Sequence, residues 1–313
     1  LPACAPAGDR PIVSAPSAPV PPERHEFVRV QMGVQSRITV YSWDPAAARD
    51  AAAAAFDRIN ALESSFTDYR PDSELSRPSD HAGKGPLPIS PDLFSILSLS
   101  KQLSSDSAGA FDITVGRSVA LWRQARRSST LPPQSEINDA LATIGSSTLI
   151  LDTDARTAAL TRPGTRLDLG GIGKGFAAQA ALDLLCYEAS PPPASLSPET
   201  SSSATRLLAN AAISTSGDTE QFIDINGQRF SHVMDPRTGL GLTTRRSVTV
   251  VADRGEIADA LSTAACILGE DASATLIAKH RAAAVFTTAA ADNPARSTID
   301  PTRRLRFPTE ARE

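Results

Sequence analysis

A glycine-rich stretch in the middle of the chain reads Leu167-Asp168-Leu169-Gly170-Gly171-Ile172-Gly173-Lys174-Gly175. Its first three residues are typical of a short strand, and the residues after it are typical of a helix that continues to about Tyr187. Unpaired N–H groups at a helix N-terminus suit phosphate, and glycines let the backbone approach an anion closely. Neither Walker A nor G-x-G-x-x-G spacing is present. The stretch therefore indicates either a phosphate site, with Lys174 as its cation, or a tight strand-to-helix turn.

Outward from this stretch, expected strands and helices mix without strict alternation. This pattern favours an α+β fold, with a mixed-sheet α/β sandwich as its core. The expected strands are 26–32, 36–42, 148–152, 157–161, 165–169, 221–225, 229–230, 247–251 and 282–287. The expected helices are 45–64, 91–105, a segment ending near 122, 133–144, 256–268 and 272–280, and residues 66–87 are expected to form a polar loop.

The 24 prolines are unevenly placed, with seven in the first 22 residues and a second cluster at 191–198. We therefore expect a disordered tether at 1–25, a folded domain at 26–290 with a low-complexity insertion at 188–204, and a C-terminal segment at 291–313 with a last strand. Leu1-Pro2-Ala3-Cys4 resembles a bacterial lipobox. It predicts a lipid-anchored protein on the periplasmic side of the cell envelope, with a cytoplasmic location as the alternative.

Composition excludes several classes of protein. The net charge of −4 gives no basic surplus for nucleic-acid binding, so we expect no such partner. No apolar run approaches the roughly 18 residues of a membrane span, so any membrane contact would come through the anchor. Three cysteines cannot form a disulfide framework. Neither H-E-x-x-H nor C-x-x-C occurs, so we expect no zinc site. A penicillin-recognising enzyme is also disfavoured, because Arg237-Thr238-Gly239 follows a proline in a turn signal instead of lying in a strand.

A second motif lies on the expected helix 256–268. Asp259, Ser262 and Thr263 are three and four residues apart, so they share one helix face. A carboxylate and two hydroxyls are hard oxygen ligands that suit Mg²⁺. Taken alone, the pattern fits better a helix whose hydroxyls bond back to the preceding turn.

A third motif is Ser231-His232-Val233-Met234-Asp235-Pro236-Arg237-Thr238-Gly239. Its Asp-Pro-Arg-Thr-Gly part is a turn signal, and His232 precedes the turn at the end of a short strand. A histidine at a loop edge is either a general base or a structural residue.

Together and in this order, the motifs resemble the FAD:protein FMN transferases, the ApbE-like flavin transferase family. The resemblance covers roughly residues 26–290, nearly all of the expected folded chain. The matching stretches are Met32-Gly33, Tyr69 to Ser76, Ala110 to Gly116, Leu167 to Gly175, Ser214 to Asp218, Ser231 to Gly239 and Ala258 to Thr263.

The resemblance implies Mg²⁺-dependent cleavage of FAD, with FMN passing as a phosphoester to a Thr or Ser of an acceptor protein in an electron-transfer complex, and with AMP released. His232 would activate the acceptor hydroxyl, and Asp259 would anchor the ion. The implied metal ligands are Gly171 (through its carbonyl), Asp259, Ser262 and Thr263. The implied FAD contacts are Met32, Tyr69, Ala110, Phe111, Asp112, Asp168, Lys174 and Val233.

The chain departs from the family pattern after the glycine-rich helix. Members usually have a strand ending in an Asn-x-Gly-Gly-Asp type motif there, whereas this chain has a Pro- and Ser-rich linker. A lost core strand would expose a sheet edge or weaken the flavin pocket. This departure keeps an alternative open, a protein that binds FAD or hydrolyses it to FMN and AMP without transfer.

Overall fold

The computed structural model describes residues 20–188, 210–217, 222–289, 295–303 and 305. Its helices are α1 (Pro45–Phe66), α2 (Ser76–Asp80), α3 (Pro91–Asp106), α4 (Gly116–Ser128), α5 (Gln134–Leu141), α6 (Gly173–Glu188), α7 (Gly255–Leu268) and α8 (Glu270–Lys279), with a 3₁₀ turn at Ser146–Thr148. Its strands are β1 (Glu23–Gln31), β2 (Val34–Ser42), β3 (Leu87–Pro88), β4 (Leu149–Asp152), β5 (Thr157–Leu160), β6 (Ala212–Gly217), β7 (Phe222–Ile225), β8 (Gln228–Ser231), β9 (Met234–Asp235), β10 (Leu240–Gly241), β11 (Arg246–Ala252), β12 (Ala283–Thr288) and β13 (Ala295–Ile299).

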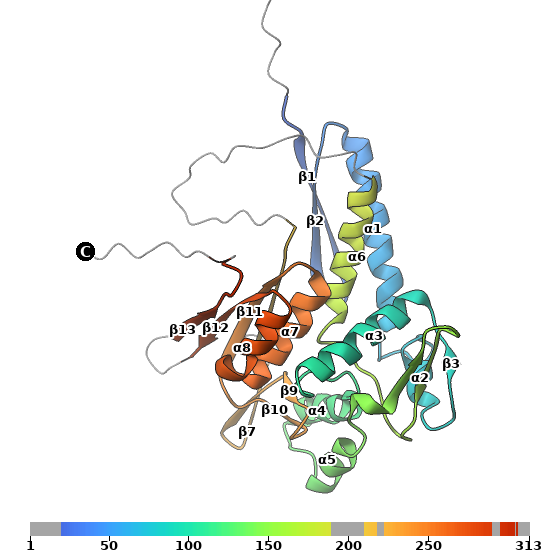
Figure 1. Ribbon diagram of the computed structural model, residues 1–313, viewed down its shortest axis with the longest axis vertical. Coiled ribbons are helices and arrows are strands. Elements are labelled where there is room, and N and C mark those ends of the chain that lie inside the picture. The colour runs from blue at the N-terminus through green and yellow to red at the C-terminus, as the bar shows by residue number, and fades with distance from the viewer. Residues whose placement is uncertain (1–19, 189–209, 218–221, 290–294, 304, 306–313) are drawn as a thin grey trace, which may run out of the picture.

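The molecule is built in layers around helix α7. An antiparallel sheet of order β13-β12-β11-β6 packs on one side of α7, and α6 packs on the other. Helix α1 lies against α6, and the β1–β2 hairpin lies against α1, as Figure 1 shows. Helix α7 has eleven buried residues, as expected for a helix between two layers. The metal-ligand motif predicted on α7 therefore lies in the interior.

The other half of the molecule holds α2 to α5 and the small sheet β3-β5-β4 (Figure 1). One buried apolar cluster joins the two halves and includes Leu93, Leu160, Ile172 and Leu261. A second cluster forms around Trp122, whose ring meets Phe230 edge to face at 5.4 Å. The mixed α and β fold class predicted from the sequence is confirmed.

Some expected elements differ in the structure. The expected strand 165–169 is wrong, because this segment makes one isolated bridge, between Val115 and Arg166. Its amides are used elsewhere, Leu167 donating to Ser79 Oγ and Asp168 to the Ile113 carbonyl. Helix α2 forms within the expected loop 66–87, α4 continues six residues beyond its expected end, and β6 is an additional strand.

Several expectations concern residues outside the described ones. The insertion 188–204 and the departure from the Gly-Gly-Asp pattern lie almost wholly in 189–209, and most of the tether lies in 1–19. Strand β1 takes in residues 23–25, so the expected tether 1–25 extends three residues too far. Strand β6 is the last strand of its sheet within the described part of the chain. Among the described helices, none has the length and hydropathy that crossing a membrane requires.

Candidate functional site

The start of α6 and the start of α7 meet through two glycines. A methyl group on Gly175 would lie 2.2 Å from the Gly255 carbonyl oxygen and 2.7 Å from the Asp259 Cβ. Only glycine permits this approach. As a result, the Gly175 amide donates to Asp259 Oδ2 at 2.9 Å, and Ser214 Oγ of β6 donates to Asp259 Oδ1 at the same distance. Asp259 is 5% exposed, and its carboxylate is fixed from two sides.

Three hydroxyl groups follow Asp259 along the contact between α7 and β6. Ser262 Oγ donates to the Asp259 carbonyl at 2.8 Å, so Ser216 Oγ must donate to Ser262 Oγ at 2.7 Å. Ser216 Oγ is then an acceptor for Thr263 Oγ1 at 3.2 Å. This order of donors uses the Thr263 proton inside the protein. It leaves the lone pairs of Thr263 Oγ1 available to a cation.

The four predicted metal ligands lie together, and we call Gly171, Asp259, Ser262 and Thr263 the metal corner. A methyl group on Gly171 would lie 3.2 Å from Thr263 Oγ1 and 3.4 Å from the Phe111 ring, so the glycine leaves a small space there. All the donors around it are oxygens, which fits Mg²⁺ and does not fit a soft metal. No cluster of three or more His, Cys, Asp or Glu side chains occurs among the described residues.

Lys174 and Met32 lie at the end of an open groove next to the glycine turn. The groove has a volume of about 420 Å³ and runs between β2 and one stripe of α6. Lys174 Nζ donates to the Gly170 carbonyl at 3.2 Å, and the side chain is otherwise exposed. Met32 has a positive φ of 51° in the turn between β1 and β2, which brings its methyl group near Gly173. Both residues can therefore meet a ligand that sits on the turn.

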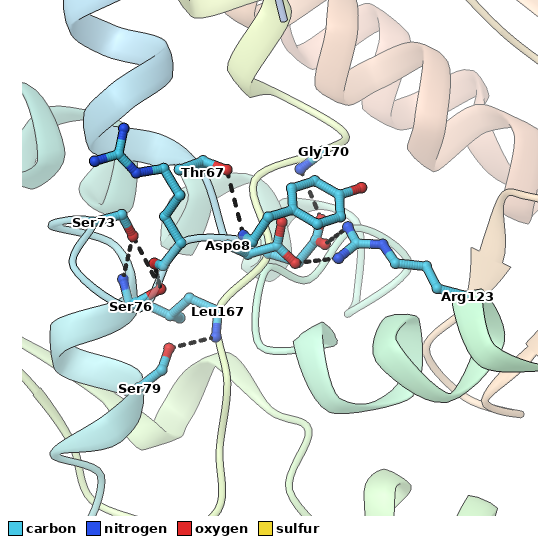
Figure 2. A network of polar contacts seen from close by, with 11 residues as sticks. Thr67, Asp68, Ser73, Ser76, Ser79, Arg123, Leu167 and Gly170 are labelled. Carbon is cyan, nitrogen blue, oxygen red and sulfur yellow. Dashed lines mark hydrogen bonds and ion pairs between the residues drawn. The ribbon is translucent and has the colours of Figure 1, made fainter. Parts of the chain in front are cut away.

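Asp168 belongs to a charged group that we call the Arg123 cluster, formed by Asp68, Tyr69, Arg123 and Asp168. Arg123 reaches from α4 and binds Asp68 and, at 2.9 Å, Asp168 (Figure 2). Its guanidinium lies 4.3 Å from the centroid of the Tyr69 ring. Burial, followed by the nearby Asp68 carboxylate, raises the pKa of Asp168, although Arg123 opposes both.

The Arg123 cluster is joined directly to the metal corner. Asp168 Oδ1 accepts from the Gly170 amide at 2.8 Å, and Gly170 precedes the predicted ligand Gly171. The structure thus brings Tyr69, Asp168, Lys174 and Asp259 into one continuous set of contacts along the glycine turn. These positions come from three segments that are far apart in the sequence.

Asp112 has a different environment from the other predicted FAD contacts. Its Oδ1 accepts from the amide and hydroxyl of Thr114, and its Oδ2 accepts from Ser104 Oγ and the Ser146 amide. Four protein donors therefore hold the carboxylate, which ties the end of α3 and the 3₁₀ turn after α5 to the loop before α4. Ala110 and Phe111 before it are buried, and Phe111 reaches Gly171 as described above.

His232 and Val233 lie on the segment between β8 and β9. The His232 side chain is exposed, whereas Val233 is buried and its amide and carbonyl bind Ser231 Oγ and the Leu242 amide. Trp122 of α4 donates to the Ser231 carbonyl at 3.1 Å. Trp122 is the sequence neighbour of Arg123, so one turn of α4 holds both the His232 segment and the Arg123 cluster.

Comparison with known proteins identifies the family. A family model described as the ApbE family matches residues 32–190 and 189–286. The chain belongs to the ApbE family. An FAD:protein FMN transferase of Chlamydia muridarum is 31% identical over 255 residues, which cover 74% of this chain and 79% of that protein. One from Haemophilus influenzae is 28% identical over 267 residues, covering 75% and 77%.

Solved structures of ApbE proteins share the fold. The apo form of the flavinyl transferase ApbE from Pseudomonas stutzeri superposes with a TM-score of 0.75 at 24% identity, covering 89% of this chain and 95% of that one. The ApbE protein from Thermotoga maritima gives the same TM-score and identity, covering 90% and 98%. This chain therefore has the fold of the solved ApbE proteins, as its motifs implied.

Sequence reasoning missed the residues that support the predicted ones. Ser214 and Ser216 lie in a recognised motif, and their spacing of two would have placed both on one face of a strand. Asp68 and Arg123 had no such signal, because their partners are 45 or more residues away along the chain. Only the folded structure connects them.

Proposed function

We propose that this chain is a Mg²⁺-dependent FAD:protein FMN transferase, which attaches FMN through a phosphoester to a Thr or Ser of an acceptor protein and releases AMP. The relatives' names support the reaction. The observation that carries the site assignment is the metal corner, where Asp259 of α7 meets Gly175 at the start of α6 and Thr263 of α7 meets Gly171 of the glycine turn.

The diphosphate of FAD would bind at the glycine turn. Lys174 would leave the Gly170 carbonyl, 3.2 Å away, for a stronger contact with a phosphate oxygen. Tyr69 and Met32 offer exposed or half-exposed surface for the ring systems, and Phe111 and Asp168 line the turn beneath them. Ala110, Asp112 and Val233 would act through the backbone or by supporting these groups, since their side chains are buried.

The metal ligands would be Asp259, Thr263 and the Gly171 carbonyl, with Ser262 as the fourth member predicted from the sequence. Bound Mg²⁺ would supply positive charge against the diphosphate and the charge that develops on the leaving AMP. Asp259 is fixed by the Gly175 amide and by Ser214, so it would hold its position before any ligand binds.

His232 would act as the general base of the transfer. The acceptor hydroxyl oxygen would attack the phosphorus on the FMN side while its proton passes to the imidazole ring, and the bond from this phosphorus to the bridging oxygen would break, so AMP leaves with that oxygen. The exposed position of His232 supports this role, because a protein acceptor must reach the base from solvent. We expect the acceptor to belong to an electron-transfer complex, where a bound flavin serves as a redox cofactor.

The alternative is an FAD-binding protein, or an FAD hydrolase that yields free FMN. It rests on the Gly-Gly-Asp departure in the sequence, and the relatives' names do not favour it. The two activities share the metal corner and differ in whether an acceptor hydroxyl or water attacks the phosphorus.

The test is incubation of the protein with FAD, Mg²⁺ and an acceptor that carries a flavinylation Thr, followed by mass spectrometry of the acceptor and quantification of AMP. We expect one FMN per acceptor and an equal amount of AMP. His232→Gln should lower adduct formation about 100-fold or more while FAD still binds. AMP with free FMN and an unmodified acceptor would assign hydrolysis, and intact FAD throughout would reject both reactions.

We also propose that Cys4 carries a lipid and holds the enzyme at the periplasmic side of the envelope. The Leu-Pro-Ala-Cys sequence supports this location. Mass spectrometry of the native protein should find an acylated Cys4, and an unmodified cysteine recovered from the membrane-free fraction would contradict the proposal.

A further inference from the structure

Arg123 was not predicted as a site residue, but it contacts two residues that were, Tyr69 and Asp168, and also Asp68. Its two terminal nitrogens bind the carboxylates of Asp68 and Asp168, and its guanidinium plane lies over the Tyr69 ring. The side chains of Arg123, Asp68 and Asp168 are 26%, 22% and 9% exposed. The planar fork of an arginine can satisfy two carboxylates and stack on a ring at once, which a lysine cannot do.

Tyr69 has little else to fix it. It lies in the loop between α1 and α2, the residue is 70% exposed, and its amide donates to Thr67 Oγ1 at 3.3 Å. Arg123 covers one face of the ring, so the opposite face is open to solvent. An open aromatic face of fixed orientation is suited to stacking against a planar ring system.

Helix α4 provides a rigid base for Arg123. Trp122 is 3% exposed and is held by Ser231 and Phe230. Gly116 begins the helix so close to the 166–167 backbone that a methyl group would lie 2.8 Å from the Arg166 carbonyl oxygen. The guanidinium therefore starts from a helix that is fixed at both its first and its middle turn.

We propose that Arg123 is a positioning residue for FAD, which acts by holding the Tyr69 ring in the orientation that stacks on a planar ring of the dinucleotide. The proposal rests on the proposed function for the identity of the ligand. Without Arg123, Asp68 and Asp168 would face each other as like charges, and the Tyr69 loop would lose its contact with α4. FAD would then have to order the loop as it binds, which lowers affinity.

The test is FAD affinity measured by quenching of flavin fluorescence, together with kcat and KM for AMP release, on the full chain. Arg123→Ala should raise the Kd and KM for FAD about tenfold, with kcat at saturating FAD changed less than about threefold. Arg123→Lys keeps a charge but loses the fork and the stack, and should raise Kd about threefold to fivefold. Arg127→Ala, which removes an exposed arginine about one helical turn further along α4, should match the wild type.

A double-mutant comparison distinguishes a positioning role from a merely structural one. Tyr69→Leu should itself weaken FAD binding, and adding Arg123→Ala to it should weaken binding less than about twofold further, because the ring is no longer there to position. The thermal unfolding midpoint of each variant identifies any loss of fold. Lys and Ala variants that bind FAD like Arg127→Ala, or fully additive effects with Tyr69→Leu, would overturn the proposal.

These outcomes are separate from failure of the proposed function. FAD binding that depends on Arg123 without any AMP or adduct would reject the transferase and keep the positioning role. Normal transfer with an FAD affinity that does not depend on Arg123 would keep the transferase and reject the positioning role. A wild-type chain that does not bind FAD would reject both.

Discussion

The metal corner and the Arg123 cluster lie on either side of the same glycine turn, and they are held in place by different forces. In the metal corner, glycines bring two helices into contact, and amides and hydroxyls then fix a single carboxylate. In the Arg123 cluster, one arginine holds two carboxylates and a ring that come from separate segments. The corner is rigid because of packing, whereas the cluster depends on one charged side chain. We expect the loss of an exposed metal-binding oxygen of the corner to slow or abolish chemistry, and changes in the cluster to alter the affinity for FAD.

The strongest test of this difference is Asp259→Asn. The amide oxygen can still accept from Gly175 and the amide nitrogen can donate to Ser214 Oγ, so the fold should be retained. The loss of charge should lower the rate of AMP release at least about 1000-fold at any FAD concentration. Calorimetry should find no Mg²⁺ binding with FAD present.

Asp57→Asn is the matched control, since Asp57 is exposed and pairs only loosely with Arg29 at 3.5 Å. It should behave like the wild type. Turnover by Asp259→Asn within tenfold of that control would move the catalytic ion away from the metal corner.

A comparison of Thr263→Val with Ser262→Ala separates two members of the corner. Thr263 Oγ1 lies beside Gly171, so replacing it with a methyl group should lower turnover about 10- to 100-fold and raise the Mg²⁺ concentration for half-maximal rate. Ser262 is fully buried and already bonded to Asp259 and Ser216, so Ser262→Ala should change turnover less than about threefold. Equal Mg²⁺ shifts in both variants would make Ser262 a ligand as well.

The packing basis of the corner is tested by Gly175→Ala. The added methyl group would meet the Gly255 carbonyl oxygen at 2.2 Å, so the two helices must separate. We expect the free energy of unfolding to fall by about 1–3 kcal/mol and turnover to fall with it. Gly173→Ala in the same helix would meet nothing closer than 3.7 Å and should leave stability unchanged or slightly increased. Similar unfolding curves for the two variants would show that close helix packing does not build the corner.

The two regions also differ in how far the sequence predicts them. Asp259, Ser262 and Thr263 share one helix, so their spacing alone places them on one face. Lys174 follows from the glycine pattern at the helix start, whereas Gly171 was predicted as a ligand only through the resemblance to the family. The bounds of most expected strands and helices agree with the structure, because hydrophobic periodicity is a local property of the sequence. The expected strand 165–169 failed because tertiary hydrogen bonds to Ser79 and Ile113 replaced sheet partners, which no local pattern reveals.

The Arg123 cluster lies beyond such reasoning. Residues 68, 123 and 168 come from a loop, a helix and the glycine turn, and each pairing requires the whole fold. Arginines and aspartates on a sequence are ordinarily solvated, so nothing marks these three as partners. The resemblance to the ApbE family named Tyr69 and Asp168, and the structure adds the side chain that joins them.

The buried carboxylate of Asp106 lies away from the glycine turn. It tests whether a buried ionic group changes the affinity for FAD only when it lies next to that turn, as the Arg123 cluster does. Asp106, at the end of α3, accepts from Lys279 Nζ at 2.7 Å and from His280 Nε2 at 2.9 Å at the end of α8. Burial alone would raise the pKa of Asp106, but the hydrogen bonds from Lys279 and His280 outweigh it and hold this pKa below its ordinary value. Because the unfolded chain then binds the proton more readily, the cluster stabilises the fold above about pH 4 and loses that contribution as the pH falls through the folded-state pKa.

Asp106→Asn should therefore lower the free energy of unfolding by about 1–2 kcal/mol at pH 7, because two donors lose a charged acceptor. The difference from the wild type should shrink as the pH is lowered below about 4, which chemical denaturation across a pH series can follow. The Kd for FAD at pH 7 should stay within about twofold of the wild type. An increase in the Kd for FAD as large as that caused by Arg123→Ala would mean that a buried ion pair acts on this site from a distance. The effect of Arg123 on affinity could then not be attributed to its place beside the glycine turn.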